Sequence, residues 1–234
     1  MTRFFVNKTS YDWVLFDLDE TLLDFPVTQA LEQTLRHYGV QVDEAGMAAY
    51  HTLNHGLWQQ YNNGEIDATA LQETRFSLFA EQVNVDPMVM NNTFLAQIVA
   101  LSMPLDGVVE TLQQLKEKVK MGIITNGFSV PQRGRLGKLG WSEWFAPLVI
   151  SDEIRVTKPD PAIFQHTLSL MGAPDPARVL MVGDNPKTDI AGAAAQGLAT
   201  CWYNPGKQSG ECDATHEIHH FSHLAGIVLG QSCS

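Results

Sequence analysis

Two carboxylates stand directly after an apolar run near the start of the chain. In the stretch VLFDLDETLLDF, residues 14–16 are apolar, and Asp17 and Asp19 follow one residue apart. Like charges held together in a buried place need a counter-charge, or one of them must stay protonated. A Mg²⁺ ion meets this need, because it prefers oxygen ligands and keeps water positions that a phosphate can take. The pair predicts a metal-assisted phosphate site, with a polar strand end and helix cap as the plain alternative.

Three further residues could complete such a site. Asp184 and Asp189, in the stretch GDNPKTD, offer two more carboxylates, and Lys158 offers a cation for an anionic substrate. A carboxylate can attack phosphorus and form an aspartyl-phosphate, while a second carboxylate moves the protons of the leaving group and of water. We therefore interpret Asp17 as the nucleophile and Asp19 as the general acid and base.

The elements that must position these residues follow from the hydrophobic pattern. Short continuous apolar runs end at Asp17, Thr125, Ser151 and Asp184, and a further run is ATCWY. Such runs are typical of strands buried on both faces of a parallel sheet. Helical patterns lie between them, at residues 107–118, 161–172 and 187–197.

This alternation of strands and helices predicts an α/β fold with a doubly wound parallel sheet of the Rossmann-like type. Ligands of such sheets bind at the carboxyl ends of the strands. Asp17, Thr125 and Asp184 are each expected at such an end. We therefore expect their side chains to meet at one edge of the sheet.

Residues 24–103 differ from the rest of the chain. They show helical periodicity, as in ALEQTLRHYGV and TALQETRFSLFAEQV, with NNGEID and VNVDP as connections between helices. We predict an all-helical cap domain at residues 24–103, inserted after the first strand. The α/β core domain is then formed by residues 1–23 and 104–234.

The chain is acidic, and this argues against some partners. Its 234 residues carry 15 Lys and Arg against 26 Asp and Glu, a formal net charge of −11. Nucleic acids and anionic membranes need basic surface, so we predict neither as a partner. No apolar run approaches the length of a membrane span, and the first residues lack the apolar region of a signal peptide.

The number and spacing of the cysteines indicate the redox state of the compartment in which the protein resides. Cys201, Cys212 and Cys233 are odd in number and form no C-x-x-C pair. This pattern favours free thiols in a reducing compartment over a disulfide framework. We therefore expect a cytoplasmic protein, and the sequence leaves its oligomeric state open.

The motifs resemble those of the aspartate-nucleophile phosphatases of the haloacid dehalogenase superfamily. Residues 17–21 match the first motif, D-x-D-x-T. Thr125, followed by Asn126 and Gly127, resembles the second motif, a Ser or Thr that ends a strand. The resemblance implies that Thr125 binds phosphoryl oxygens. Asn126 is then a further substrate contact, or a residue that only shapes the turn with Gly127.

Two more motifs of the same superfamily follow in order. Lys158 in KPDPAIF resembles the third, and Asp184 with Asp189 resembles the fourth, G-D-x-x-x-x-D. The resemblance implies that Lys158 binds phosphoryl oxygens and counters the charge of Asp17. It also implies a Mg²⁺ ion held by Asp17, by the backbone carbonyl of Asp19 and by Asp184, with Asp189 supporting this site from behind.

Within the superfamily, the chain is similar to the bacterial pyrimidine 5′-nucleotidases. The similarity lies in LWQQYNNG at residues 57–64, in MGIITNGF and in LVISDE. It implies a Mg²⁺-dependent phosphomonoesterase acting on a small phosphate ester, a nucleoside 5′-monophosphate such as UMP, dUMP or dTMP. A phosphatase for sugar phosphates or other small phosphate esters is the alternative, because the core chemistry is shared.

Two other classes fit the residues less well. A haloacid dehalogenase needs no proton donor for a halide, so the presence of Asp19 argues against it. A non-catalytic binding protein would have no need to keep all the carboxylates together with Lys158.

Several patterns outside these motifs have both a functional and a structural interpretation. Trp58 and Tyr61 are spaced for one helix face, which favours cap core over a platform for a base, and Arg75 is a substrate contact or an exposed helix residue. The stretch HEIHH at residues 216–220 matches the zinc motif H-E-x-x-H, but an expected strand there favours a surface histidine cluster. The glycine-rich GRLGKLG at residues 134–140 lacks the Ser or Thr that follows the lysine of a P-loop.

Overall fold

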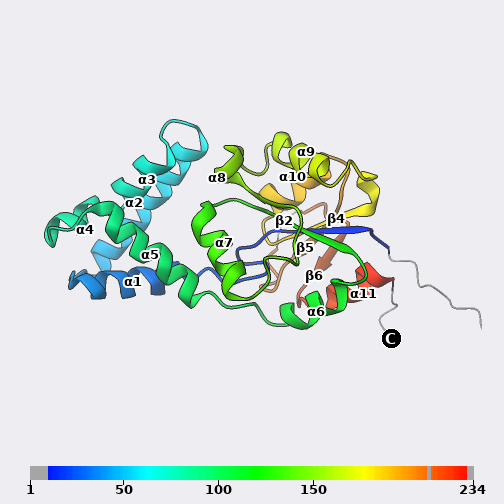
Figure 1. Cartoon of the computed structure of the whole chain (residues 1–234), viewed down its shortest axis with the longest axis horizontal. Coiled ribbons are helices and arrows are strands. Elements are labelled where there is room, and N and C mark those ends of the chain that lie inside the picture. The colour runs from blue at the N-terminus through cyan, green and yellow to red at the C-terminus, as the bar shows by residue number, and fades with distance from the viewer. Residues whose placement is uncertain (1–9, 210–211, 231–234) are drawn as a thin grey trace, which may run out of the picture. The chain divides into compact units, whose positions relative to one another are not determined.

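Six parallel strands form the sheet of the computed structural model, which describes residues 10–209 and 212–230 (Figure 1). Their order across the sheet is β3-β2-β1-β4-β5-β6. Their bounds are Trp13–Phe16 (β1), Lys120–Thr125 (β2), Leu148–Ile150 (β3), Val179–Gly183 (β4), Ala199–Tyr203 (β5) and His216–Ile218 (β6). β1 to β5 coincide with the apolar runs of the sequence, and β6 lies where a strand was expected in HEIHH. The predicted parallel α/β fold is confirmed.

The register of the strands brings the polar strand ends to one edge. The last residue of β1 pairs with Ile123 of β2 and with Val182 of β4. Asp17 therefore leaves the sheet beside Thr125, which ends β2, and beside Asp184, which follows β4. The three residues lie at the carboxyl edge, where parallel sheets place their ligands.

Helices cover both faces of this sheet. Figure 1 shows α9 and α10 on one side of it and α6 and α11 on the other. The helices of this part are α6 (Val108–Leu115), α8 (Ser151–Ile154), α9 (Pro161–Leu170), α10 (Ala191–Ala194) and α11 (His223–Leu229), with a 3₁₀-helix at Pro176–Arg178 and a π-helix at Pro186–Ile190. The helix expected at residues 187–197 is thus a π-helical turn followed by a short α-helix.

A second compact unit is all-helical. It consists of residues 25–102 together with residues 130–138, and the remaining described residues belong with the sheet. Its helices are α1 (Val27–Tyr38), α2 (Glu44–Asn62), α3 (Ala68–Thr74), α4 (Ser77–Gln82), α5 (Pro87–Leu101) and nearly all of α7 (Ser129–Lys138). The role of residues 24–103 as a cap domain stays a prediction.

Aspartates fix where three of these helices begin. The carboxylates of Asp43, Asp67 and Asp86 each accept a hydrogen bond from a backbone N–H two or three residues further on. Such N-caps satisfy donors that the first helical turn leaves open. The periodic stretch at residues 69–83 is divided at Arg75 and Phe76, so it forms α3 and α4 instead of one helix.

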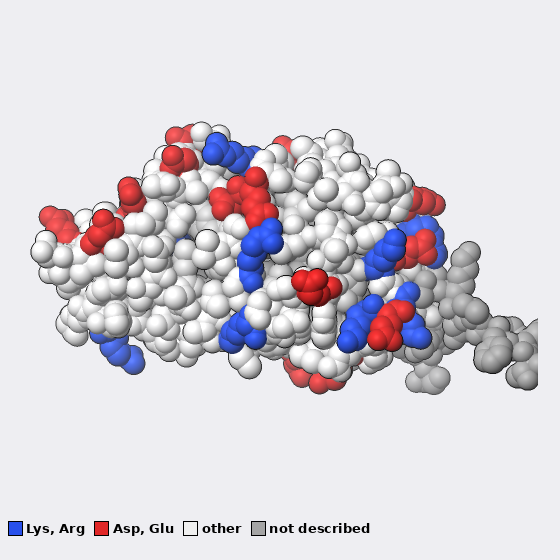
Figure 2. All heavy atoms as spheres, viewed as in Figure 1, with Lys and Arg blue, Asp and Glu red and all other residues white. Residues whose placement is uncertain are grey.

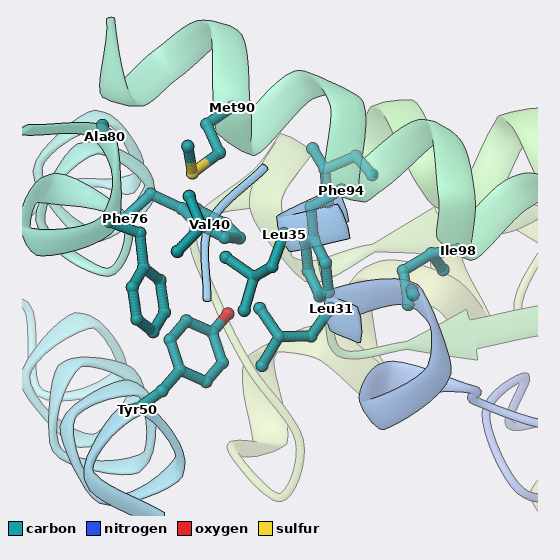
Figure 3. Packing of buried hydrophobic residues seen from close by; sticks show 12 residues of the cluster. Leu31, Leu35, Val40, Tyr50, Phe76, Ala80, Met90, Phe94 and Ile98 are labelled. Atoms are coloured by element: carbon teal, nitrogen blue, oxygen red, sulfur yellow. The ribbon is translucent and has the colours of Figure 1, made fainter. Parts of the chain in front are cut away.

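The helical unit has its own hydrophobic core. Figure 3 shows side chains from α1, α2, α4 and α5 pointing toward one another. Phe76 lies against Phe94, with ring centroids 5.4 Å apart, and against Tyr50, at 5.6 Å. Aromatic pairs at such distances add to the stabilisation that burial provides. The residues labelled there are Leu31, Leu35, Val40, Tyr50, Phe76, Ala80, Met90, Phe94 and Ile98.

The surface bears on the predicted partners. Among the described residues, the helices are all too short or too polar to span a membrane. On the face seen in Figure 2, Lys and Arg side chains form small separate groups among Asp and Glu side chains. Cys201 and Cys212 are free thiols. The predictions made on residues 1–9 and on Cys233 lie outside the described residues.

Candidate active site

Asp17, Lys158 and Asp189 form a buried cluster of charges. The ammonium Nζ of Lys158 lies 2.5 Å from Oδ1 of Asp17 and 2.7 Å from Oδ1 of Asp189. The side chains of Lys158 and Asp189 are only 2% and 1% exposed, so water screens these contacts little. Asp17 and Asp189 are 141 and 31 positions away from Lys158 in the sequence, and the fold brings both of them into contact with its ammonium group.

The shifts in pKa follow from this burial and crowding. Burial raises the pKa of Asp17 well above its ordinary value, against the attraction of Lys158, and the charges of Asp189 and Asp19 raise it further. Burial alone would lower the pKa of Lys158, but the charges of Asp17 and Asp189 outweigh it and raise the pKa. Lys158 is therefore a cation at neutral pH, and the cluster around it carries a surplus of negative charge.

The chain after β4 holds Asp189 in place. The backbone N–H of Asn185 donates to Oδ2 of Asp189 at 3.0 Å, and the hydroxyl of Thr188 donates to Oδ1 at 3.3 Å. Gly183 is needed here, because a Cβ at that position would lie 2.3 Å from Oδ2 of Asp189. The glycine that precedes Asp184 in the sequence thus leaves the space that the Asp189 carboxylate fills.

Three carboxylates are arranged to hold a cation. Asp17, Asp184 and Asp189 each offer an oxygen, and these oxygens lie within 4.8 Å of one another. Oxygen donors with surplus negative charge are what Mg²⁺ takes in proteins, so the donor set fits this ion. Asp189 offers an oxygen to this set, whereas the motif resemblance implied that it supports the metal ligands from behind. The predicted contribution of the Asp19 backbone carbonyl stays a prediction.

Asp184 is the least buried of the three. Its Oδ1 accepts a hydrogen bond from the hydroxyl of Thr21 at 3.4 Å, and the indole N–H of Trp202 donates to its backbone carbonyl at 2.9 Å. Burial, and then the charge of Asp189, raise the pKa of Asp184 to about 6. A cation beside this carboxylate would oppose that shift.

Asp19 lies in a tight turn that follows β1. The N–H groups of Leu22 and Leu23 both donate to the carbonyl of Leu18, and the N–H of Glu20 donates to the carbonyl of Leu23. Glu20 has a φ of 56°, in the left-handed region that non-glycine residues rarely adopt. The turn therefore keeps Asp19 close enough to Asp17 for its charge to raise the pKa of Asp17.

Asn126 joins two of the predicted motifs. Its side-chain Oδ1 accepts from the backbone N–H of Lys158 at 2.8 Å, and its Nδ2 donates to the Lys158 carbonyl at 3.1 Å. Thr125 before it is fully buried at the end of β2. The structure therefore gives Asn126 a way to position Lys158, and the contacts of Thr125 and Asn126 with a phosphate stay predictions.

Sequence reasoning gave no part to two residues that shape the site. Thr21 donates to Asp184, and the hydroxyl of Ser151 accepts a hydrogen bond from the N–H of Gly127 at 3.0 Å. Both could have been found from their places, since Thr21 lies within the first motif and Ser151 ends an apolar run. The identity of their partners depends on the fold.

Residues of the helical unit are placed differently from what the sequence indicated. Arg75 is 4% exposed, so it is no surface residue, and its Nε donates to Oδ1 of Asn91 at 2.9 Å. Trp58 and Tyr61 are half-buried, with ring centroids 5.6 Å apart, and lie outside the cluster of Figure 3. The expectation that this pair belongs to the core of the helical unit stays a prediction.

The histidines near the end of the chain each contact a different residue. His216 lies in β6 and shares a hydrogen bond with the hydroxyl of Tyr11 at 2.8 Å. His219 contacts the carbonyl of Asn204, and His220 contacts Asp106. The expected strand is present, and the residues of the H-E-x-x-H pattern lie in and after it instead of on one helix face.

Comparisons with known proteins agree with this geometry. A family model described as haloacid dehalogenase-like hydrolase matches residues 11–197. The chain is 42% identical over 194 residues to the pyrimidine 5′-nucleotidase YjjG of Escherichia coli strain K12, which covers 83% of this chain and 86% of that protein. It is 30% identical over 224 residues to the pyrimidine 5′-nucleotidase PynA of Streptococcus pneumoniae, covering 92% and 93% of the two chains.

A solved structure is similar over nearly the whole chain. It is the HAD-hydrolase YfnB of Bacillus subtilis bound to magnesium, with a TM-score of 0.79 and 26% identity over 93% of this chain and 98% of that one. The sheet order, the buried lysine between carboxylates and the family match across residues 11–197 lead to one conclusion. The chain belongs to the haloacid dehalogenase-like hydrolases.

Proposed function

We propose that this hydrolase is a Mg²⁺-dependent phosphomonoesterase for nucleoside 5′-monophosphates, with a preference for pyrimidine bases. The observation that carries the reaction type is the cluster in which Lys158 Nζ lies 2.5 Å from Asp17, at an edge where three carboxylates offer oxygens to one cation. The similarity to two proteins named pyrimidine 5′-nucleotidases supports the substrate class.

In the first half of the proposed reaction, Asp17 is the nucleophile. Its carboxylate oxygen forms a bond to phosphorus while the bond from phosphorus to the 5′-oxygen breaks, which leaves an aspartyl-phosphate. Asp19 gives its proton to the departing 5′-oxygen, so the nucleoside leaves as a neutral alcohol. In this proposal, Lys158 and Thr125 both bind the phosphoryl oxygens, and the ammonium group of Lys158 offsets their negative charge.

In the second half, Asp19 acts in the opposite direction. It takes a proton from a water molecule, whose oxygen attacks phosphorus, and the bond from phosphorus to Asp17 breaks. Phosphate leaves, and both aspartates return to their starting states. The Asn126 amide keeps the Lys158 backbone in place throughout, because it bonds both the N–H and the carbonyl of that residue.

The residues that would hold the metal are Asp17, Asp184 and Asp189, whose oxygens lie within 4.8 Å of one another. The resemblance of the first motif adds the backbone carbonyl of Asp19 to this proposed set. A Mg²⁺ ion there supplies positive charge that offsets the carboxylates and the phosphate together. Asp189 also contacts the ammonium group of Lys158. This carboxylate therefore lies between the lysine and the oxygens that would bind the metal.

Phosphate release from a panel of substrates tests the proposal. We would use UMP, dUMP, dTMP, CMP, AMP, GMP and several sugar phosphates with Mg²⁺, and Asp17→Asn as the control for contaminating phosphatases. We expect the uracil and thymine nucleotides to be preferred. Preference for sugar phosphates would keep Asp17 and Asp19 in their places but contradict the substrate class. Release from none of these esters would contradict the reaction type.

A further inference from the structure

The chain passes between the sheet-containing unit and the helical unit at residues 24–25, 102–103, 129–130 and 138–139. We call residues 24–25 and 102–103 the two crossover segments. Helix α7 follows β2 and contains most of the glycine-rich stretch that resembled a P-loop. Nine of its residues, 130–138, belong to the helical unit, although they lie far along the chain from residues 25–102.

Lys138, the last residue of α7, contacts the end of α5. Its Nζ donates to the carbonyl of Ala100 at 2.6 Å and to the carbonyl of Ser102 at 2.9 Å. These carbonyls lie at the C-terminus of a helix, where backbone acceptors are open and a positive charge is favourable. Lys138 thus caps α5 at the point where the chain enters the second crossover segment.

Arg135, one turn earlier on α7, contacts both crossover segments. Its guanidinium lies 5.3 Å from the ring centroid of Phe25, and its Nη1 lies 3.5 Å from the hydroxyl of Ser102. The close approach of the helices depends on Gly134, because a Cβ there would lie 3.0 Å from a methyl group of Val99 on α5. Gly134, Arg135 and Lys138 therefore all take part in the contact of α7 with α5 and the residues that flank the helical unit.

The two crossover segments are also bonded to each other. The N–H of Met103 donates to Oδ1 of Asp24 at 2.6 Å, and the N–H of Asp24 donates to the Met103 carbonyl at 3.0 Å. One residue further on, Leu23 forms an antiparallel bridge with Pro104. A movement of either segment would therefore carry the other with it.

We propose that Lys138 and Arg135 are positioning residues that hold the crossover segments in one arrangement, so that α7 acts as part of the hinge of the helical unit. The inference rests on the proposed function for its effect on turnover. Domain hinges are a few loop or element-end residues that absorb backbone changes. Residues 24–25 precede α1 and residues 102–103 follow α5, so they lie at such positions. Lys138 and Arg135 act through these segments and are not proposed to touch the substrate.

Hydrogen exchange of the crossover amides tests the hinge contact without any substrate. We would compare the wild type with Lys138→Met, which keeps the length of the side chain but loses its hydrogen bonds, and with Lys118→Met, an exposed lysine on another part of the chain. We expect exchange at Ser102 and Met103 to become about fivefold faster or more in Lys138→Met, given what such hydrogen bonds contribute. Unchanged exchange would overturn the proposal.

The effect on turnover is measured separately. In Lys138→Met we expect KM for UMP to rise about threefold or more while KM for phenyl phosphate, which lacks a nucleoside, changes by less than twofold, consistent with a loss of about one hydrogen bond. Lys138→Arg should restore most of the UMP value. Equal effects on both esters would overturn the positioning role. A wild type that cleaves phenyl phosphate but no nucleotide would contradict the proposed substrate, and the exchange result would still decide the hinge contact.

Discussion

Lys158 is shared between two carboxylates, and this sharing sets what each residue of the cluster can do. A lysine 2.5 Å from Asp17 and 2.7 Å from Asp189 stays charged and cannot serve as a base. Asp17 and Asp189 are both buried, and neither could keep a charge there without the lysine or a metal. The residues therefore work as a unit, and replacing one of them should change the others.

Asp17→Asn should remove turnover while leaving the fold intact. The amide has nearly the same shape, but it cannot attack phosphorus, so we expect kcat to fall by about 10³-fold or more. Because burial disfavours the charged form of Asp17, loss of this charge should not lower the melting temperature by more than a few degrees. Steady-state kinetics and thermal unfolding measure the two effects.

The matched control is Asp106→Asn, because the Asp106 side chain is 94% exposed on the surface of the protein. It should keep wild-type kcat. Wild-type turnover in Asp17→Asn, after mass spectrometry has shown that the amide is intact, would contradict the role of Asp17 as the nucleophile.

Gly183→Ala should disturb the same cluster from behind. The new methyl group would lie 2.3 Å from Oδ2 of Asp189, so Asp189 or the chain around it must shift, which disturbs its contact with Lys158. We expect a loss of about 1–3 kcal/mol in the free energy of unfolding, as for other overpacked sites, and a fall in kcat of at least about tenfold. Gly56→Ala is the control, because a Cβ at Gly56 meets nothing within 4 Å. Equal stability and activity of both variants would contradict the need for a glycine.

At the scale of elements, hydrophobic runs were sufficient to predict β1 to β5, whereas β6 is the polar stretch HEI. Trp13–Phe16 and Val179–Gly183 are buried on both faces, so apolarity alone marks them. Helix α7 is not evident from its sequence, because SVPQRGRLGK contains a proline and two glycines and few apolar residues. It packs against α5 through Gly134 and Lys138, and no local pattern can show these contacts.

The residues of the candidate site also differ in whether the sequence could predict their places and partners. Asp17 and Asp184 could be predicted because each ends an apolar run and so lies at the carboxyl edge of the sheet. The partners of Asn126 and the burial of Arg75 could not, since they depend on residues that are distant in the sequence. Motifs give the types of residue at a site, and the fold decides which atoms meet.

Asn126→Ala tests how two elements are joined at the site. The variant loses both hydrogen bonds between the end of β2 and the Lys158 backbone. We expect about 1–3 kcal/mol less stability, because the N–H and carbonyl of Lys158 are left without these partners, and a lower kcat as Nζ shifts. Asn92→Ala, an exposed asparagine on α5, is the control for stability. If Asn126→Ala kept wild-type stability and changed KM alone, Asn126 would be a substrate contact instead of a support for Lys158.

At the scale of the whole molecule, the site adds to a charge that is already strongly negative. The chain has a formal net charge of −11, and three of its carboxylates gather around one point. Cations are drawn to such a region, while anionic substrates are repelled unless local positive charge offsets it. Metal binding should therefore be visible in the stability of the entire protein, since it acts on the folded state only.

Removal of Mg²⁺ should lower the melting temperature, and the size of this effect should depend on pH. The pKa of Asp184 is raised to about 6, above its unfolded value, so its contribution to stability is present below pH 4 and is lost as the pH rises through 6. Mg²⁺ offsets that loss, because it needs the charged carboxylate. We expect the increase in melting temperature with Mg²⁺ to be larger at pH 7.5 than at pH 5, measured against EDTA-treated protein. In Asp184→Asn the metal-free protein should be more stable than wild type at pH 7.5, and its response to Mg²⁺ should be weak. A full response in this variant would remove Asp184 from the metal site.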